Sequence, residues 1–554
     1  MTHTADSSTE GTDDTASTDG TAGTGTPVEH IDVVIVGAGL SGVGAAYRLQ
    51  TECPERSYAI IEARQSMGGT WDLFRYPGVR SDSDMFTLGY AFKPWRESKV
   101  LADGRSILDY IKETAAQFGI DRRIRYGTKV VGADWSTATA RWTVTLERTE
   151  EDGSRILTTV TCDFLYSCAG YYNYDQGHAP EFAGADSFTG TIVHPQFWPE
   201  DLDHTGKRVV VIGSGATAVT LVPAMAGSAA HVTMLQRSPT WIGSLPSRDR
   251  LADGIRAVLP ANAAHRVVRT KNILFAIGLY QFCRRSPKAA RKLLTGLNKR
   301  IVKDDRLVAD HLTPSYDPWD QRLCAVPDAD LFEVLKTGEA EIVTDHVERF
   351  VPEGIRLKSG RVLEADVVVT ATGLQLLAFG GIEPRVDGQP VELNRQFVWR
   401  GAMMTGVPNF AVCIGYTNAS WTLRADLTSR LVCKVLNHMR AHDYAAVEPR
   451  PTSTLDERPL LDLASGYVQR SIDAFPRQGD RGPWKVRQNY VLDAASTMRT
   501  NLRKTLAPTP LSAVRGARAA SEKSAAAEQP TAPGQPTAPE QPVAAGPEKR
   551  WRSA

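Results

Sequence analysis

Two short apolar runs, each followed by glycines and then by a helical pattern, organise the chain. In IDVVIVGAGLSGVGAAYRLQ, residues 31–36 are almost continuously apolar, which predicts a buried strand of a parallel sheet. The composition after Gly42 predicts a helix. The same succession recurs in KRVVVIGSGATAVTLV, where residues 208–212 predict a second strand. Strands that alternate with helices predict an α/β fold.

The first glycine turn has the spacing of a dinucleotide-binding site. Gly37, Gly39 and Gly42 allow the backbone to approach a pyrophosphate, which then lies at the positive N-terminus of the helix. The next apolar strand, YAIIE, ends at Glu62, 20 residues after the last glycine, where an acid binds ribose hydroxyls. Because an acid disfavours a 2′-phosphate, we predict FAD or NAD here. An ordinary glycine turn is the alternative.

The second glycine turn predicts the opposite ribose chemistry. Gly213, Gly215 and Ala218 form the GxGxxA variant, and the following strand, HVTMLQRS, carries Gln236 and Arg237 in place of an acid. A guanidinium binds a 2′-phosphate through charged hydrogen bonds worth about 1.5–3 kcal/mol. We therefore predict NADPH at this site, unless Arg237 is only a solvated residue at a strand end. Further predicted contacts are Ser214, Ala216, Thr217, Val219 and Ser238.

Two other apolar strands that end in small residues predict where the chain passes between domains. DFLYSCAGYY ends its apolar run at residues 169–170, and ADVVVTATGL does so at 371–373. We expect an NADPH-binding domain inserted into a discontinuous FAD-binding domain. The expected bounds are 29–170 and 371–505 for the FAD domain and 171–370 for the NADPH domain.

The two ends of the chain have a composition typical of disorder. Residues 1–28 are mostly Thr, Ser, Asp and Gly, and residues 506–554 are rich in Ala, Pro, Glu and Gln. Neither segment offers enough apolar surface to offset the entropy of ordering, so both are predicted to be disordered tails. The N-terminus lacks the basic and apolar parts of a signal peptide, and no window of the chain reaches the roughly 18 uninterrupted apolar residues of a membrane span. A cytoplasmic protein without a transmembrane segment is therefore predicted.

Charge and cysteine content exclude several function classes. The chain has 64 Lys and Arg against 63 Asp and Glu, a balance that argues against nucleic-acid binding. Its seven cysteines include no CxxC pair. A pyridine nucleotide–disulfide reductase is therefore excluded, no metal site is predicted, and the pattern suits a reducing compartment.

Two longer motifs resemble those of type I Baeyer–Villiger monooxygenases. FTGTIVHPQFWP, residues 188–199, matches that family's fingerprint at every defined position, including Trp198, where amine-oxidising relatives usually differ. GGTWDLFRYPGVRSD, residues 68–82, matches a second family pattern. The runs QRSPTW, YDPWDQRLC and GYTNASWTL are most similar to the ethionamide-activating group within the family. The resemblance covers nearly all of residues 29–505.

The resemblance implies an FAD enzyme that uses NADPH and O₂ to convert ketones into esters or lactones through a C4a-peroxyflavin. It also implies oxidation of sulfur in sulfides or thioamides. An amine- or sulfide-oxidising flavin monooxygenase is one alternative, and a non-catalytic, nucleotide-sensing flavoprotein is another. The substrate itself and the oligomeric state stay open.

The resemblance further implies roles for individual residues. Arg322 in YDPWDQRLC would stabilise negative charge beside the flavin, and Asp82 would hold its guanidinium. His194 and Trp198 would couple the position of NADP to domain rotation rather than take part in chemistry. Many members have Lys where this chain has Gln321, which leaves more of the 2′-phosphate binding to Arg237. The other expected cofactor contacts are Ser41, Thr70, Trp71, Asp72, Leu73, Arg80, Ser81 and Val130, with Trp484 as a candidate to close over NADP⁺.

Residues 250–310 have no counterpart in a minimal nucleotide-binding domain. The run KNILFAIGLYQF is apolar, and RRSPKAARKLLTGLNKRIVK is basic with leucines at helical spacing. We predict a helical insertion that covers the substrate channel. A basic amphipathic helix resting on a membrane surface is the alternative.

Overall fold

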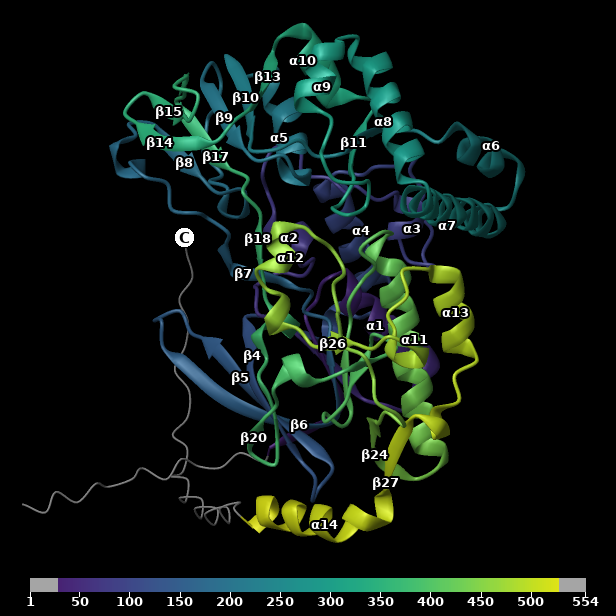
Figure 1. The fold of residues 1–554 in the computed structure, drawn as a ribbon. Helices are drawn as coiled ribbons and strands as arrows, with labels where there is room; N and C mark the ends of the chain where they lie inside the picture. Colours follow the sequence, from purple (N-terminus) through teal and green to yellow (C-terminus); the bar gives the residue numbers. More distant parts are fainter. Residues whose placement is uncertain (1–27, 528–554) are drawn as a thin grey trace, which may run out of the picture.

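Residues 28–527 are described by the computed structural model, and they form two α/β units that lie one above the other in Figure 1. The upper unit is built on a five-stranded parallel sheet in the order β13-β10-β9-β17-β8. Its strands are β8 (Thr191–Val193), β9 (Arg208–Ile212), β10 (His231–Gln236), β13 (Ala340–Thr344) and β17 (Val367–Thr370). Helix α5 (Ala216–Ala226) follows the second glycine turn and packs on this sheet.

The lower unit is built on an 11-stranded mixed sheet around β1. Strand β1 pairs in parallel with β2 and β6, and Val33, Val34 and Ile35 in it are completely buried, as the apolar run predicts. The main strands are β1 (Glu29–Val36), β2 (Tyr58–Ile61), β3 (Ile124–Arg125), β4 (Thr128–Ser136), β5 (Arg141–Thr149), β6 (Arg155–Ser167), β19 (Pro384–Val386) and β23 (Phe410–Val412). Helices α1 (Leu40–Glu52) and α11 (Trp421–Ala441) pack together against this sheet.

Two short strands carry the chain between the units. Strand β7 (Tyr172–Gly177) leaves the lower unit after β6, and β18 (Leu374–Leu376) returns to it after β17. The two strands pair antiparallel between the units in Figure 1. Since β23 then joins β6 in the lower sheet, the upper unit interrupts the lower one in sequence. The predicted fold class, one dinucleotide-binding domain inserted into a second, is confirmed.

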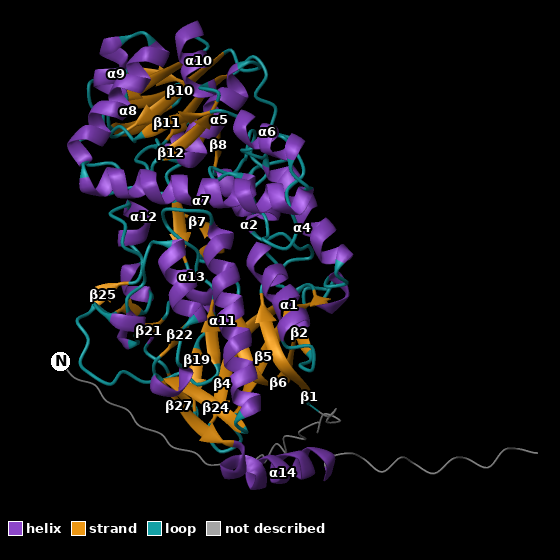
Figure 2. Ribbon diagram, turned by 90° about the vertical axis from the view of Figure 1, so that its right-hand side faces the viewer, coloured by secondary structure: helices purple, strands orange, loops and turns teal. Residues whose placement is uncertain are grey.

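A helical insertion follows β10 and β11 (Ile242–Leu245) in the upper unit. Its helices are α6 (Arg250–Val258), α7 (Ala261–Arg285), α8 (Pro287–Val302) and α9 (Asp305–His311). In Figure 2 helix α7 runs across the junction between the two units. The guanidinium of Arg269 is buried and donates to the carbonyl oxygens of Phe86 and Gly89, both at 2.8 Å. These bonds fix α7 on α3 (Met85–Leu88) of the lower unit.

The C-terminal prediction was wrong for residues 506–527. Strand β27 (Leu506–Pro510) pairs with β24 (Tyr444–Pro449), and helix α14 (Leu511–Ala527) follows. Val514 is buried, and Arg518, one turn later, donates to the carbonyl oxygens of residues 139 and 140 at 2.7 and 2.9 Å. A few spaced contacts thus order a segment whose average composition is typical of disorder. The disorder predicted for residues 1–27 and 528–554 falls outside the described residues.

Candidate active site

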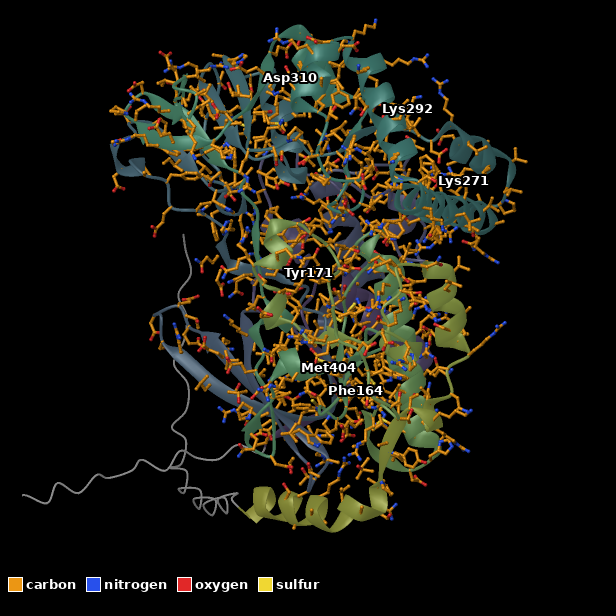
Figure 3. All side chains as sticks on the ribbon, viewed as in Figure 1. Phe164, Tyr171, Lys271, Lys292, Asp310 and Met404 are labelled. Atoms are coloured by element: carbon orange, nitrogen blue, oxygen red, sulfur yellow. The ribbon has the colours of Figure 1, made fainter. Side chains whose placement is uncertain are left out.

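A cleft between the two units contains many of the predicted cofactor contacts. It holds about 570 Å³ of water-accessible volume, within the usual range for small-molecule and cofactor sites. Tyr171, which lines it, is labelled at the junction of the units in Figure 3. The predicted residues that line the cleft are Gly37, Gly39, Ser41, Glu62, Thr70, Trp71, Arg80, Ser81, Asp82, Val130, Ala216, Thr217 and Arg322.

The first glycine turn has room for backbone only. Gly37 has a φ of +97°, which favours glycine, and a Cβ at Gly42 would lie 1.9 Å from the carbonyl oxygen of Gly37. Gly39 is the N-cap of α1, and no side chain caps this helix. The amide groups at the start of α1 therefore face the cleft next to a turn without side chains. This arrangement fits the pyrophosphate of a dinucleotide.

Glu62 lies where the predicted ribose-binding acid should be. Val36 pairs with Ile61 in the parallel register of β1 and β2, so Glu62 follows directly beside the glycine turn. Its buried carboxylate accepts hydrogen bonds from the backbone N–H of Ala38 at 2.7 Å and of Arg64 at 2.9 Å. Burial raises the pKa of Glu62, whereas these two bonds favour its charged form. The residues present therefore fit FAD.

The second unit repeats this register without the acid. Ile212 pairs with Leu235, so Gln236 occupies the position equivalent to that of the first acid. The Gln236 side chain is buried and donates to the carbonyl oxygen of His311 at 2.8 Å and to Oγ1 of Thr344 at 2.9 Å. Arg237 and Ser238 are exposed and do not line the cleft. A 2′-phosphate would therefore meet Arg237 at the protein surface, since Gln236 points into the domain.

The second glycine turn is held against the strand that leads back to the lower unit. A Cβ at Gly213 would lie 2.3 Å from the carbonyl oxygen of Ala371, whereas a Cβ at Gly215 would meet nothing within 4 Å. Gly215 therefore leaves an open approach for a ligand. Ser214 forms a hydroxyl–hydroxyl hydrogen bond with Thr240 at 2.7 Å. The predicted contacts Ala218 and Val219 are buried in the core of the upper unit instead.

Arg322 and Asp82 meet inside the cleft. Nη2 of Arg322 lies 2.9 Å from Oδ1 of Asp82, although 240 residues separate them in sequence. Their side chains are 34% and 24% exposed. The charge of Asp82 is the main cause that raises the pKa of Arg322, and Tyr171 and Tyr172 lie close to the guanidinium. Asp82 therefore fixes the position of the Arg322 guanidinium, which is a cation at the junction of the units.

The motif at residues 68–82 divides into cleft residues and supporting residues. The Asp72 carboxylate lies outside the cleft lining and accepts hydrogen bonds from Arg64 at 2.6 Å and from Ser66 at 2.5 Å. Leu73 is buried in the core of the upper unit. Arg80 lines the cleft and pairs with Asp330 of helix α10 (Asp330–Thr337) at 2.5 Å. Direct cofactor contact is therefore geometrically open to Arg80 but not to the side chains of Asp72 and Leu73.

The fingerprint at residues 188–199 packs on the strand that connects the units. A Cβ at Gly177, the last residue of β7, would lie 2.1 Å from the His194 ring. The Gln196 amide donates to the carbonyl oxygens of Asn173 and Tyr174 in the same strand, at 2.8 and 3.0 Å. A Cβ at Gly190 would contact the carbonyl oxygen of residue 366 at 2.4 Å, which explains the glycine. The motif therefore lies at the interdomain crossing rather than on the cleft wall.

The two predicted tryptophans differ in their surroundings. Trp198 is half-buried against the core of the upper unit. Trp484 is 5% exposed, belongs to the core of the lower unit and does not line the cleft. In this structure Trp484 therefore does not lie where its ring could close over NADP⁺.

Sequence reasoning missed several aromatic residues of the cleft. Nε1 of Trp421, at the start of α11, donates to Oγ of Ser41 at 2.7 Å, and its ring packs on Gly415, where a Cβ would lie 2.3 Å away. Tyr171 and Tyr172 follow the apolar strand that ends at residue 167. Tyrosines just after a buried strand in a parallel sheet, and a tryptophan after a glycine turn, were the available signals.

Two dinucleotide-binding folds that share one cleft, with an arginine–carboxylate pair between them, define an oxidoreductase that brings two nucleotide cofactors together. The flavin-binding monooxygenase-like family model matches residues 96–250, and an NAD(P)-binding Rossmann-like domain model matches residues 35–97. The chain is 54% identical over 467 residues to the FAD-containing monooxygenase EthA of Mycobacterium tuberculosis, covering 84% of this chain and 94% of that protein.

Other relatives agree. The chain is 52% identical to EthA of Mycolicibacterium smegmatis, over 84% of this chain and 94% of the relative, and 47% identical to a probable FAD-binding monooxygenase, AlmA, of Acinetobacter baylyi, over 84% and 93%. A solved steroid monooxygenase bound to NADP has the same fold, with a TM-score of 0.68, 23% identity, and coverage of 87% of this chain and 100% of that one. The chain therefore belongs to the family of flavin-binding monooxygenases that includes EthA.

Proposed function

We propose that the protein is an NADPH- and O₂-dependent Baeyer–Villiger monooxygenase that inserts an oxygen atom beside a ketone carbonyl to give an ester or lactone. We include sulfur oxidation of sulfides or thioamides in its range. The single observation that supports this proposal most is the ion pair of Arg322 and Asp82 in the cleft, because oxygen insertion needs a fixed cation where negative charge develops.

FAD, when bound and reduced by NADPH, supplies the activation of O₂. The chain's residues bind and orient the reactants. Glu62 and the first glycine turn would hold the adenosine end of FAD, and the second turn with Arg237 would hold NADPH. Arg322 would offset negative charge on the oxygen-transfer side, and Asp82 would fix the direction of its guanidinium. Tyr171, Tyr172 and Trp421 line the cleft and would limit the entry of water.

The names of relatives support an oxygen-transfer enzyme rather than a nucleotide sensor. The two EthA relatives, which share 54% and 52% sequence identity with this chain, are named as FAD-containing monooxygenases. The solved neighbours include a steroid monooxygenase and a cyclohexanone monooxygenase, and the latter has a TM-score of 0.62 at 20% identity. That likeness concerns the fold, so the ketone substrate is our proposal.

The test is to purify the full chain, confirm bound FAD by its absorbance, and screen ketones and thioamides for NADPH oxidation that yields oxygenated product. Ester or lactone from a ketone supports the proposal. Oxidised amines or sulfides with no ester from any ketone would favour the amine- and sulfide-oxidising alternative. NADPH and FAD binding with no oxygenated product from any substrate would favour a sensing role.

We also propose a cytoplasmic location. All seven cysteines are buried and free, as expected where thiols stay reduced. None of the helices within residues 28–527 is long and apolar enough to cross a membrane. Cell fractionation that separates the cytoplasmic proteins, including those released from membranes by salt, from secreted proteins would test this location.

A further inference from the structure

Helix α7 exposes an apolar stripe to solvent. Val267, Leu274, Phe275 and Phe282 are 45%, 55%, 61% and 37% exposed, and their spacing places them on one face of the helix. Arg269 and Ile273 lie on the opposite face and are buried. These four exposed residues are called the α7 stripe below. A soluble surface rarely exposes so many large apolar side chains in one row.

The α7 stripe is part of a wider apolar surface. Twelve of the eighteen exposed large hydrophobic residues between residues 28 and 527 lie in residues 251–297 or in α13 (Tyr490–Met498). Helices α6, α7 and α13 lie on the right of Figure 1 and face the viewer in Figure 2, so the two views place them on the same side of the molecule. The additional exposed residues of this side include Leu251, Val258, Val491, Leu492 and Met498.

The same insertion carries most of the chain's unbalanced positive charge. Residues 250–303 contain thirteen Lys and Arg and a single Asp, whereas the whole chain is nearly neutral. Some of these cations are used internally, such as Lys271, which pairs with Asp249. Others have no carboxylate partner among the described residues, including Arg266, Arg285, Lys288 and Lys292. Figure 3 shows Lys271 and Lys292 on the outer part of the upper unit.

We propose that this insertion docks the protein on a bilayer that contains anionic phospholipids, with α7 lying in the plane of the interface. Exposed apolar side chains would enter the acyl boundary, and the flanking cations would meet the lipid phosphates. Because the cations spread over three helices, α6, α7 and α8, rather than converge on a pocket, they match an extended surface of uniform negative charge. An acidic protein partner would need a localised complementary site instead.

Docking through α7 would place the cleft next to the bilayer. The Asn272 amide of α7 donates to Asp84 at 2.8 Å, two residues from Asp82, and Leu88 of α3 lines the cleft beneath α7. Apolar substrates dissolved in the membrane would therefore meet the protein at a helix that packs on α3, and α3 contributes Leu88 to the wall of the candidate active site. This consequence rests on the proposed function, whereas membrane docking itself does not.

Sedimentation of the FAD-loaded full chain with vesicles tests the docking. We expect binding to phosphatidylcholine vesicles that contain phosphatidylglycerol, weak binding to pure phosphatidylcholine, and release by salt. The double variant Leu274→Glu and Phe275→Glu should bind at least about tenfold more weakly, because two apolar contacts are lost and two repelled charges are added. The matched control is Ile156→Glu with Leu157→Glu in β6, two neighbouring residues that are 43% and 63% exposed.

Equal losses in the two double variants, or no binding of the parent chain to anionic vesicles at low salt, would overturn the proposal. So would a parent dimer that becomes monomeric only in the Leu274→Glu and Phe275→Glu variant, because a second copy would then cover the α7 stripe. Flavin absorbance and NADPH oxidation of each variant show that the fold is intact. A failed proposed function would change product formation and leave vesicle binding as it is.

A second cavity, separate from the cleft, is lined by an excess of cations. It holds about 230 Å³ between α11, α13 and residues 482–487, and Arg400, Arg424, Lys485 and Arg487 line it. Asp493 is the carboxylate in its wall, and Arg424 already pairs with it at 2.8 Å. The other three cations have no carboxylate partner within residues 28–527.

Both the backbone conformation and the surroundings of Arg400 in this cavity are energetically unfavourable. Its backbone has a φ of +52°, a left-handed conformation that is unfavourable for a residue with a Cβ. Its Nε is buried without a hydrogen-bond partner in the described part of the chain. Burial lowers the pKa of Arg400, and the charge of Arg487 acts in the same direction. A bound anion would relieve both effects.

We infer that this cavity binds the phosphate group of a phosphomonoester. A guanidinium group can bind two phosphate oxygens at once through parallel hydrogen bonds. The cavity wall also contains the hydroxyl groups of Thr428 and Thr497. Asp493 also accepts a hydrogen bond from the Tyr416 hydroxyl at 2.8 Å, and Tyr416 lines the active-site cleft. The phosphate site would thus be connected to the cleft through a single hydrogen bond between these two side chains.

Calorimetric titration of the FAD- and NADP⁺-saturated chain with inorganic phosphate tests the site, because saturation occupies the 2′-phosphate position. We expect saturable binding of one phosphate that weakens at least about tenfold in the double variant Arg400→Gln and Arg487→Gln. The control double variant, Arg306→Gln with Arg361→Gln, removes the same charge from the upper unit. Absence of saturable binding at millimolar phosphate, or equal losses in both double variants, would overturn the inference.

The source of the phosphate is tested in the same assay by comparing glycerol phosphate in solution with vesicles that contain phosphatidic acid. Preference for glycerol phosphate identifies a soluble metabolite, and preference for the vesicles identifies a lipid headgroup. Either preference supports the site only if it is lost in the Arg400→Gln and Arg487→Gln variant and kept in the control.

Discussion

Replacing Arg322 with Ala should separate flavin reduction from oxygen transfer. Its guanidinium lies 2.9 Å from Asp82 and is positioned from the opposite side of the interdomain cleft, so it is a preorganised charge. Loss of one such group typically costs about 2.7–4 kcal/mol, or on the order of 10²–10³ in rate. One third of the Arg322 side chain is exposed, and water screens its charge, so we expect a loss near the lower limit of that range. Hydride transfer depends on cofactor geometry and should survive.

The assay compares anaerobic reduction of the flavin by NADPH in stopped flow with ester formation by the same preparations. Arg322→Ala should form ester about a hundredfold more slowly while flavin reduction stays within about tenfold of the parent rate. Arg322→Lys should recover part of the loss, and Asp82→Asn should give a milder defect because the cation stays but loses its orientation. The reasoning is refuted if Arg322→Ala makes ester at the parent rate, or if flavin reduction fails as severely as oxygen transfer.

Four further predictions follow from the geometry. Arg237→Ala should raise KM for NADPH by about tenfold to a hundredfold and leave KM for NADH nearly unchanged, since the substitution removes one charge-assisted phosphate contact. Equal effects on the two KM values in steady-state kinetics would contradict a role of Arg237 in binding the 2′-phosphate. Gly42→Ala should abolish FAD retention, because its Cβ would lie 1.9 Å from a carbonyl oxygen, and flavin absorbance after gel filtration measures it. A chain that ends at Ala527 should match the full chain in Tm, whereas a chain that ends at Thr505 should melt lower because it lacks β27 and α14; equal Tm values would show that these elements contribute nothing. Burial lowers the pKa of His265 to about 4, so below about pH 6.5 the unfolded chain binds more protons than the folded chain does. The free energy of unfolding should therefore fall by up to about 3 kcal/mol as the pH drops from 6.5 to 4. His265→Met should flatten this part of the Tm–pH profile, and an unchanged profile would show that the ring is not buried as a neutral group.

The sequence alone was sufficient for features that depend on neighbouring residues. The strand, glycine turn and helix around Gly37 and Gly42 follow from local backbone geometry, because Gly37 has a φ of +97° and a Cβ at Gly42 would lie 1.9 Å from the carbonyl oxygen of Gly37. The parallel register then places Glu62 beside the turn. Each of these steps spans one supersecondary unit, so a single stretch of sequence contains all the information.

Other features depend on distant partners and could not be derived in this way. Arg322 and Asp82 come from different units, and the resemblance suggested their pairing whereas the residues themselves did not. Trp484 enters a core that is completed by residues far away in sequence. Val514 and Arg518 order a C-terminal helix through contacts with the hairpin of β4 and β5, which average composition does not reveal.

The position of Gln236 follows from the sequence, whereas the orientation of its side chain does not. The loss of an acid at this position was the reason to expect NADPH, and the register confirms that Gln236 stands where Glu62 stands in the first unit. The structure adds that the amide is turned inward to Thr344 and the carbonyl of His311, so it offers the ribose neither repulsion nor a contact. Arg237 is exposed, and charge pairs in water are weakened by salt. We therefore expect selectivity for the 2′-phosphate to depend mainly on the exposed Arg237 guanidinium, because the inward turn of Gln236 removes its side chain from the site.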